Sequence, residues 1–268
     1  MRPEGKIQPA EGYANVGDIR LFYRCEGKGT PLLMLHGNGQ DHTVFRSYTA
    51  VFRKAFRVIL ADSREHGRSG ASGPETELRI SGMAADMAKL LDALQVERVI
   101  LFGFSDGANI ALEFASLYPD RTIAVIAANG NALPSGMRLP VMAALWLTTG
   151  FFRILAWGCP CSRIRMRANR RIRLNGLMLH SPVLSASRLE RIKAPVLLLT
   201  GTRDVIRVSH TKWMYKKIPH AKLFLLRGGT HDMLFRHQYE CMRAIRGFLR
   251  AEHLFHGRRQ KGDNCPLT

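Results

Sequence analysis

One serine of the chain stands in a setting that favours nucleophilic chemistry. Residues 98–111 read RVILFGFSDGANIA, so an aliphatic run ends in Gly103-Phe104-Ser105-Asp106-Gly107 and an apolar-periodic segment follows at once. This pattern predicts a buried strand, a very sharp turn and a helix. Such a turn makes the serine hydroxyl project clear of both elements, and small residues two positions away let them approach. We therefore predict that Ser105 is a nucleophile, although G-x-S-x-G alone also occurs by chance.

A serine hydroxyl attacks poorly unless a base removes its proton. The chain holds ten histidines, and His231 has the most informative context. It lies in Gly228-Gly229-Thr230-His231-Asp232, directly after the last predicted strand, and ligand sites gather at such strand ends. We predict that His231 is the base. A solvated loop histidine is the alternative.

The histidine needs a carboxylate to fix its tautomer, and the chain offers few acids between Ser105 and His231. Three belong to the predicted helix after Ser105 or to its end. Glu190 precedes a strand, which places it at the opposite edge of a sheet. Asp204 follows the predicted strand 195–200 and so lies at the same edge as Ser105. We predict that Asp204 is the acid, with a helix N-cap as its alternative role.

Backbone N–H groups are candidates for stabilising a developing oxyanion. The N–H of Asp106 would lie at a helix N-terminus, where negative charge is favoured. A second donor should follow the strand 31–35, and the loop His36-Gly37-Asn38-Gly39 offers the N–H of Asn38. We predict Asn38 and Asp106 as the oxyanion hole, with an ordinary turn as the alternative for the Asn38 loop.

Periodicity indicates an α/β chain in which strands alternate with helices. Two short antiparallel strands are predicted within 11–25, and parallel strands at 31–35, 57–61, 99–104, 123–128, 195–200 and 222–226. Helices are predicted near 43–55, 80–94, 108–118, 208–218 and 236–251. The alternation breaks over 132–190. We therefore expect a core of 10–131 and 191–252, a helical insertion over 132–190, and a disordered basic tail over 253–268.

The insertion is apolar in its first half and rich in arginine in its second. Leu139 to Trp157 carries a single charge, and six arginines lie between 163 and 173. The apolar half predicts an acyl pocket lined by Met142, Leu145, Trp146, Phe151 or Phe152, and packing on the sheet is the alternative. The arginines indicate either an anionic substrate or a solvated face.

The formal net charge of +19 is confined to the second half of the chain. Residues 1–130 hold 15 basic and 15 acidic residues, whereas 131–268 hold 25 and 6. From Arg121 to Leu189 there is no carboxylate. This asymmetry can attract an anionic membrane or an acidic substrate, or can reflect an arginine-biased source. No recognisable module supports nucleic-acid binding, so none is expected.

Several features favour a cytoplasmic protein. No run of 18 or more uncharged apolar residues is present, as a membrane span requires, and MRPEGKIQPA lacks the apolar region of a secretory signal. The five cysteines are irregularly spaced, which indicates free thiols in a reducing compartment.

Taken together, the motifs resemble those of the α/β-hydrolase family over about residues 10–252. The resemblance rests on five motifs in order: His36-Gly37-Asn38-Gly39, the run from Asp62 to Ser69, Gly103 to Gly107, Gly201 to Asp204, and Gly229-Thr230-His231. It implies an α/β-hydrolase fold, with a mostly parallel eight-stranded sheet, flanking helices and a helical cap after the sixth strand. The chain is most similar to the small valacyclovir-hydrolase-like esterases, in which an acid beside the nucleophile can hold an amino group. Asp106 occupies that position, and capping its own helix is the simpler role.

These observations predict a carboxylesterase-like serine hydrolase that cleaves a small ester, thioester or related acyl compound through an acyl-enzyme. No metal and no organic cofactor is expected, and the partner is a small-molecule acyl substrate. Alternatives are a carbon–carbon hydrolase, a perhydrolase or a lyase on the same fold, a non-catalytic ligand receptor, or a protein that binds an anionic membrane through its basic cap. Serine at position 105 argues against the dehalogenase and epoxide-hydrolase branches of the family, which need a carboxylate nucleophile. The sequence predicts no oligomeric state.

Overall fold

The computed structural model describes residues 10–71, 73 and 77–255. Its centre is one eight-stranded sheet with the strand order β1-β2-β4-β3-β5-β6-β7-β8, in which β2 runs antiparallel to both of its neighbours and all other strand pairs are parallel. The strands are β1 Ala10–Asn15, β2 Arg20–Glu26, β3 Thr30–Leu35, β4 Phe56–Ala61, β5 Val99–Phe104, β6 Thr122–Ala128, β7 Val196–Gly201 and β8 Ala221–Leu226. The predicted fold class, the α/β-hydrolase fold, is confirmed.

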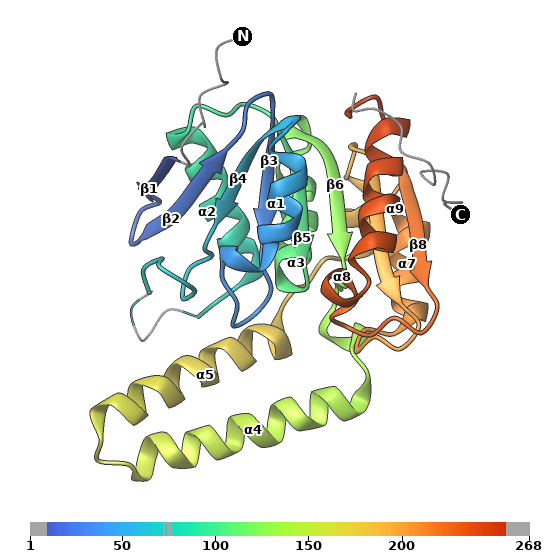
Figure 1. Cartoon of the computed structure of the whole chain (residues 1–268). Coiled ribbons are helices and arrows are strands. Elements are labelled where there is room, and N and C mark those ends of the chain that lie inside the picture. The colour runs from blue at the N-terminus through green and yellow to red at the C-terminus, as the bar shows by residue number, and fades with distance from the viewer. Residues whose placement is uncertain (1–9, 72, 74–76, 256–268) are drawn as a thin grey trace.

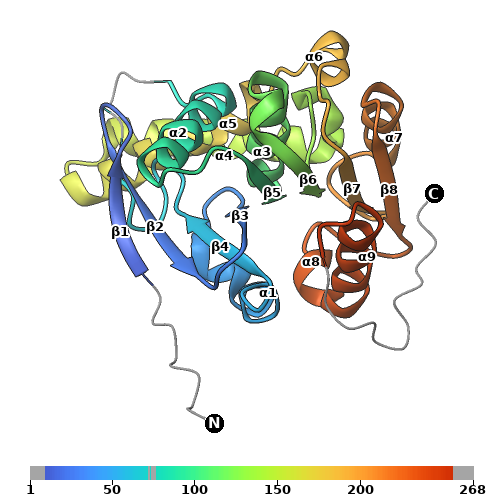
Figure 2. The same ribbon diagram turned by 90° about the horizontal axis from the view of Figure 1, so that it is seen from above.

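Helices cover both faces of the sheet, which explains the unbroken apolar runs of its central strands (Figure 2). Successive residues of a strand point to opposite faces, so Leu33 and Leu35 join one hydrophobic core while Leu32 and Met34 join the other. The first core contains residues of α2 Ile80–Ala93, α3 Asp106–Leu117 and α7 Val208–Lys217. The second contains residues of α1 Arg46–Phe52, α8 Met233–Arg236 and α9 Gln238–Ala251.

The carboxyl ends of the parallel strands meet at one edge of the sheet because these strands all run in the same direction. The loops after β3, β5, β7 and β8 therefore lie together, although they are far apart in sequence. The same edge faces the helices inserted between β6 and β7 (Figure 1). This arrangement is what brings the predicted site residues into reach of one another.

The insertion between β6 and β7 is helical, with α4 Leu139–Gly158, α5 Ser162–His180 and α6 Ala186–Glu190. α4 and α5 form an antiparallel hairpin that extends beyond the sheet (Figure 1). Hydrogen bonds from Asn175 Nδ2 to Thr148 Oγ1 (3.2 Å) and Thr149 Oγ1 (3.1 Å) join the two helices. α6 instead contacts α3 and α7, so the last part of the predicted insertion packs with the core.

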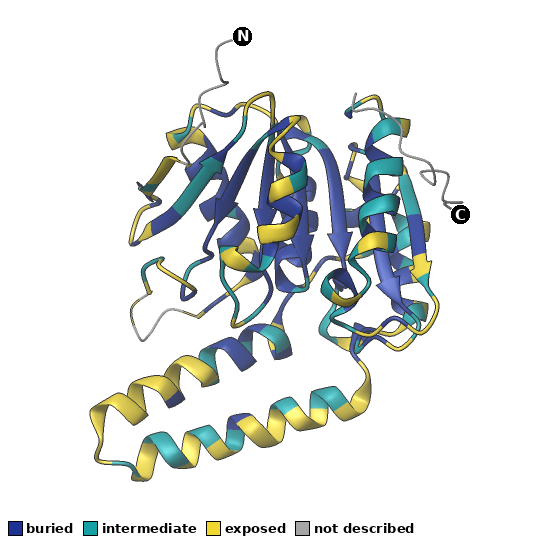
Figure 3. Ribbon diagram, in the orientation of Figure 1, coloured by how far each residue is buried: buried dark blue, intermediate teal, exposed yellow. Residues whose placement is uncertain are grey.

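The exposure of α4 corrects one sequence interpretation, the alternative that residues 139–157 pack on the sheet. Arg153 interrupts the apolar run, so the sequence showed no uncharged membrane-length segment. Yet α4, alone among the described helices, is long and apolar enough by length and composition to cross a membrane, with mean hydropathy 1.6. Only 6% of its most apolar window is buried, and its outer face is exposed along its length (Figure 3). α4 therefore packs on α5 and not on the sheet.

The predicted disordered tail lies largely outside the described residues, since 256–268 are not described. Its first three residues, 253–255, correct the prediction. The Phe255 side chain is buried and stacks on Phe56 with a ring-centroid distance of 5.8 Å. The ordered chain therefore continues past α9 because this aromatic contact covers the end of the second core.

Candidate active site

The turn between β5 and α3 holds Ser105 in a strained conformation. Its φ of 54° and ψ of −121° are rarely adopted by residues with a side chain. The glycines of the turn permit this geometry by close approach. A Cβ at Gly103 would lie 2.1 Å from the carbonyl oxygen of Gly107, and a Cβ at Gly107 would lie 2.0 Å from that of Leu35. The sequence pattern thus corresponds to a real steric requirement.

The structure brings Ser105, His231 and Asp204 into one hydrogen-bonded chain. His231 Nε2 lies 3.0 Å from Ser105 Oγ, and His231 Nδ1 lies 2.7 Å from Asp204 Oδ1. A carboxylate only accepts, so Nδ1 carries the proton and Nε2 is free to accept from the serine hydroxyl. This is the geometry in which imidazole can remove a proton from serine.

Asp204 is fully buried and its second oxygen is also bonded. Asn129 Nδ2 donates to Asp204 Oδ2 at 2.5 Å, and the N–H of Ile206 donates to Oδ1 at 3.2 Å. These bonds fix the carboxylate toward His231. Sequence reasoning missed Asn129, although its position directly after β6 places it at the same edge of the sheet as Asp204.

The two predicted oxyanion donors lie beside Ser105. A Cβ built on Gly37 would be 3.0 Å from Ser105 Cβ, so the Asn38 loop passes close to the nucleophile. Within the described part of the chain, neither the Asn38 nor the Asp106 N–H donates a backbone hydrogen bond outside a helix. Asp106 begins α3, where the N–H groups have no partner in the helix. Both groups therefore remain able to bind an oxyanion.

The Asp106 side chain does not cap its own helix. Its Oδ2 accepts from Asn38 Nδ2 at 2.9 Å and its Oδ1 from Asn109 Nδ2 at 3.3 Å. Burial raises the pKa of this carboxyl, and the hydrogen bond from Asn38 opposes that rise. Asn38 Nδ2 also donates to the carbonyl of Leu174 on α5 at 3.1 Å. One side-chain amide therefore joins the loop after β3, the turn that holds Ser105 and the helical insertion.

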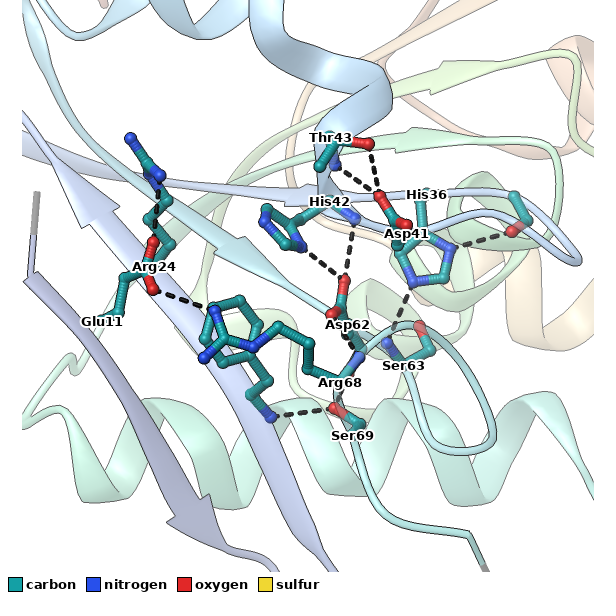
Figure 4. Close-up of polar contacts among 12 residues, drawn as sticks. Glu11, Arg24, His36, Asp41, His42, Thr43, Asp62, Ser63, Arg68 and Ser69 are labelled. Carbon is teal, nitrogen blue, oxygen red and sulfur yellow. Dashed lines mark hydrogen bonds and ion pairs between the residues drawn. The ribbon is translucent and has the colours of Figure 1, made fainter.

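The run from Asp62 to Ser69 is hydrogen-bonded to His36 and His42, which lie in the segment that follows β3 (Figure 4). Asp62 is fully buried and accepts from the N–H groups of His42 and Arg68, each at 2.8 Å. The N–H of Ser63 donates to His36 Nε2 at 3.1 Å, so His36 Nδ1 carries the proton and donates to Gly37 O at 2.8 Å. Burial lowers the pKa of His36, which keeps this bridge neutral.

A cavity of about 450 Å³ opens at Ser105. Apolar and polar groups from the loops at the sheet edge line it: Gly37, Asn38, Gln40, Phe104, Ser105, Arg203, Val205, Thr230, His231, Asp232 and Phe235. Its size suits a small molecule. Among the described residues, no group of three or more metal-ligating side chains could hold a metal ion.

The structure does not bring the predicted pocket residues of the cap to this cavity. Trp146 is 50% exposed and contacts His180 of α5, while Phe151 is 60% exposed and contacts Phe152. None of the three lines the cavity. Met142 and Leu145 are half-buried and do not line it either. The reason is that α5 carries the cap's buried contacts to the core, through Leu174 and Leu177.

Comparison with known proteins agrees with this architecture. Residues 30–160 match the family described as alpha/beta hydrolase fold. The chain is 37% identical over 125 residues to a protein named "Putative carbamate hydrolase RutD" from Azorhizobium caulinodans, a match that covers 46% of each chain. A protein of the same name from Caulobacter is 26% identical over 82% of this chain and 91% of its own length.

Solved structures share the fold over most of the chain. A thermophilic esterase from Thermogutta terrifontis superposes with a TM-score of 0.73 at 24% identity, covering 92% of this chain and 99% of the esterase. An identity this low shows a common fold and leaves the chemistry to be argued from the site.

Proposed function

Because this chain belongs to the α/β-hydrolase fold family, we propose that it is a serine hydrolase acting on a small acyl compound. One observation carries the proposal. Ser105 combines a left-handed backbone conformation with a hydrogen bond of 3.0 Å to His231, which is itself held by Asp204 at 2.7 Å. A serine in an ordinary structural role needs neither the strain nor the base.

In the first half of the reaction, Ser105 Oγ attacks the carbonyl carbon and its proton passes to His231 Nε2. The substrate oxygen becomes an oxyanion, and the N–H groups of Asn38 and Asp106 are placed to stabilise it. Asp204 stabilises the imidazolium. As the carbonyl re-forms, His231 returns the proton to the leaving group, which departs and leaves an acyl-enzyme at Ser105.

In the second half, water takes the place of the leaving group. His231 accepts a proton from water, whose oxygen attacks the acyl carbon through the same oxyanion arrangement. His231 then protonates Ser105 Oγ as the acid product leaves. The enzyme returns to its starting state, and every proton moves through Nε2 of one histidine.

The cavity favours a compact substrate. Its lining places Phe104, Val205 and Phe235 beside polar groups, and Arg203 lies exposed at its rim. The relatives named as carbamate hydrolases extend the candidate class from esters and thioesters to carbamates, whose carbonyl is attacked in the same way. A carbon–carbon hydrolase, a perhydrolase, a lyase and a ligand receptor are the alternative readings of the same site.

Hydrolysis of p-nitrophenyl acetate tests the proposal. The full chain should release p-nitrophenol, and Ser105→Ala should abolish that release. Ser47→Ala is the matched control, since Ser47 lies exposed on α1. Equal rates in Ser105→Ala and the full chain would exclude Ser105 as the nucleophile. A panel of esters, thioesters and carbamates then defines the substrate class.

A cytoplasmic location remains a prediction from the sequence. The described cysteines, Cys25, Cys159, Cys161 and Cys241, are free, as a reducing compartment favours.

A further inference from the structure

The α4–α5 hairpin exposes more large apolar side chains than a protein surface in water normally does. Six lie on α4: Leu139, Trp146, Leu147, Phe151, Ile154 and Trp157. Leu147 is 76% exposed, Ile154 71% and Trp157 91%. Leu147, Phe151 and Ile154 recur at spacings of four and three residues, which places them on one side of the helix, and exposed residues run along the length of α4 (Figure 3). A continuous exposed apolar face of this kind marks a docking surface.

The helix paired with α4 carries positive charge, and neither helix of the hairpin carries a carboxylate. α5 carries six arginines and no acidic residue. Arg170 and Arg173 are bonded to Glu65 of the core. Within the described residues, no carboxylate pairs with Arg163, Arg165 or Arg167, which lie exposed on the first two turns of α5, or with exposed Arg171. The hairpin therefore joins an apolar face to uncompensated positive charge.

We propose that the α4–α5 hairpin docks on anionic lipid bilayers. Apolar side chains would enter the boundary between headgroups and acyl chains, and the arginines would contact lipid phosphates. Trp157 stands near the tip, and tryptophan favours this boundary because its ring is apolar and its N–H is polar. Charge complementarity selects a membrane over a second copy of the chain, because two copies meeting through this face would bring together unpaired arginines of like charge.

The hairpin is built to lie on a bilayer and not to cross it. If α4 crossed, α5 would have to return through the same bilayer with its arginines. Each arginine at the bilayer centre disfavours insertion by about a hundredfold. The base of α4 is also fixed to the core, since the N–H of Arg138 donates to Val205 O at 2.8 Å and its Nε to Asp204 O at 2.7 Å. The hairpin is thus a firmly attached element that presents one face.

Vesicle sedimentation of the full chain tests this proposal. We expect binding to vesicles of phosphatidylcholine and phosphatidylglycerol in equal amounts, much weaker binding to phosphatidylcholine alone, and release by high salt. Replacing Arg163, Arg165, Arg167 and Arg171 by Gln should weaken binding more than about 100-fold, since each basic residue at the surface contributes about fivefold. Removing four exposed basic residues elsewhere, Lys54, Arg98, Lys212 and Lys216, is the matched control for net charge.

A second pair of variants separates the apolar contribution. Leu147→Ser, Ile154→Ser and Trp157→Ser together should weaken binding at least about tenfold, whereas Leu117→Ser, Leu225→Ser and Tyr239→Ser, also exposed, should not. Circular dichroism verifies that each variant is folded. Equal binding to neutral and anionic vesicles, or equal loss in the hairpin and control variants, would overturn the proposal. So would a dimer, seen by sedimentation velocity without vesicles, that the three hairpin serines abolish.

Discussion

The sheet edge around Ser105 and the outer part of the cap, formed by the exposed residues of α4, are opposite in physical character. At the sheet edge, the buried polar groups of the site are held by short hydrogen bonds, as Asp204 is by Asn129 and His231. On the cap, large apolar groups such as Trp157 are exposed. Buried polar groups and exposed apolar groups both cost free energy in an isolated soluble protein. The site's polar groups are paired largely within the chain, whereas the apolar groups on α4 are left uncovered by the described chain.

This contrast means that substitutions at the two regions should have very different effects. Changes at the sheet edge should reduce catalysis or folding strongly. Changes on the outer cap should leave both nearly untouched and alter only binding to surfaces.

Asp204→Asn should lower kcat by about 10⁴-fold, because an amide cannot fix the His231 tautomer or stabilise its cation. Steady-state hydrolysis of p-nitrophenyl acetate measures this. Asp232→Asn is the matched control, since Asp232 also lines the cavity but pairs with Arg236 and Thr230. A similar kcat in both variants would remove Asp204 from the proposed triad.

Gly103→Ala should destabilise the fold by at least about 3 kcal/mol, because the new Cβ would meet rigid backbone at 2.1 Å. Urea denaturation measures this free energy. Gly82→Ala on α2 is the control, as nothing lies within 4 Å of its Cβ, and it should be neutral or stabilising by up to about 1 kcal/mol. Equal stabilities would show that the turn relaxes.

Acid should destabilise the sheet-edge region through two buried histidines. Burial lowers the pKa of His66 to about 4 and that of His210 to about 4. Below the ordinary pKa of 6.5 the unfolded chain binds protons that the folded chain does not. Stability from these groups is therefore complete above pH 6.5 and falls as the pH drops toward 4, by at most about 3 kcal/mol for His66.

Denaturation at several pH values measures the histidine effect. His66→Gln should flatten the decline between pH 6.5 and 4, and His220→Gln, an exposed histidine, should not. An unchanged slope in His66→Gln would assign acid sensitivity to other groups.

The smallest effect is expected on the cap. The triple change Leu147→Ser, Ile154→Ser and Trp157→Ser should leave hydrolysis of soluble p-nitrophenyl acetate within about twofold, because none of these residues lines the cavity. A large loss of kcat without vesicles would mean that the outer cap takes part in catalysis, and the contrast between the two regions would fail.

The contrast also explains what the sequence could predict. The sharp turn that holds Ser105 could be predicted because its constraints are local, since only glycine fits at 103 and 107. The placement of Asp204 beside His231 could be predicted from the strands that precede them. Each residue follows a parallel strand, and the carboxyl ends of parallel strands meet at one edge of the sheet. Asn129 was not predicted, since nothing in an asparagine after a strand says that its amide reaches another loop.

The cap could not be predicted in the same way. An apolar run such as 139–157 normally indicates burial. Whether α4 is exposed depends instead on how α5 packs, and here α5 covers only one side of α4. The interpretation of Trp146, Phe151 and Phe152 as pocket lining assumed that apolar helices cover the nearest site. The hydrogen bond from Asn38 Nδ2 to the carbonyl of Leu174 shows that α5 is the cap helix that contacts the site.

The most direct test of the central claim is covalent. A fluorophosphonate reacts with a serine that is activated by a neighbouring base, and peptide mass spectrometry locates the adduct. We expect a single adduct on Ser105 that is lost in Ser105→Ala and strongly slowed in His231→Ala. An adduct on another residue, or labelling that persists in Ser105→Ala, would contradict it.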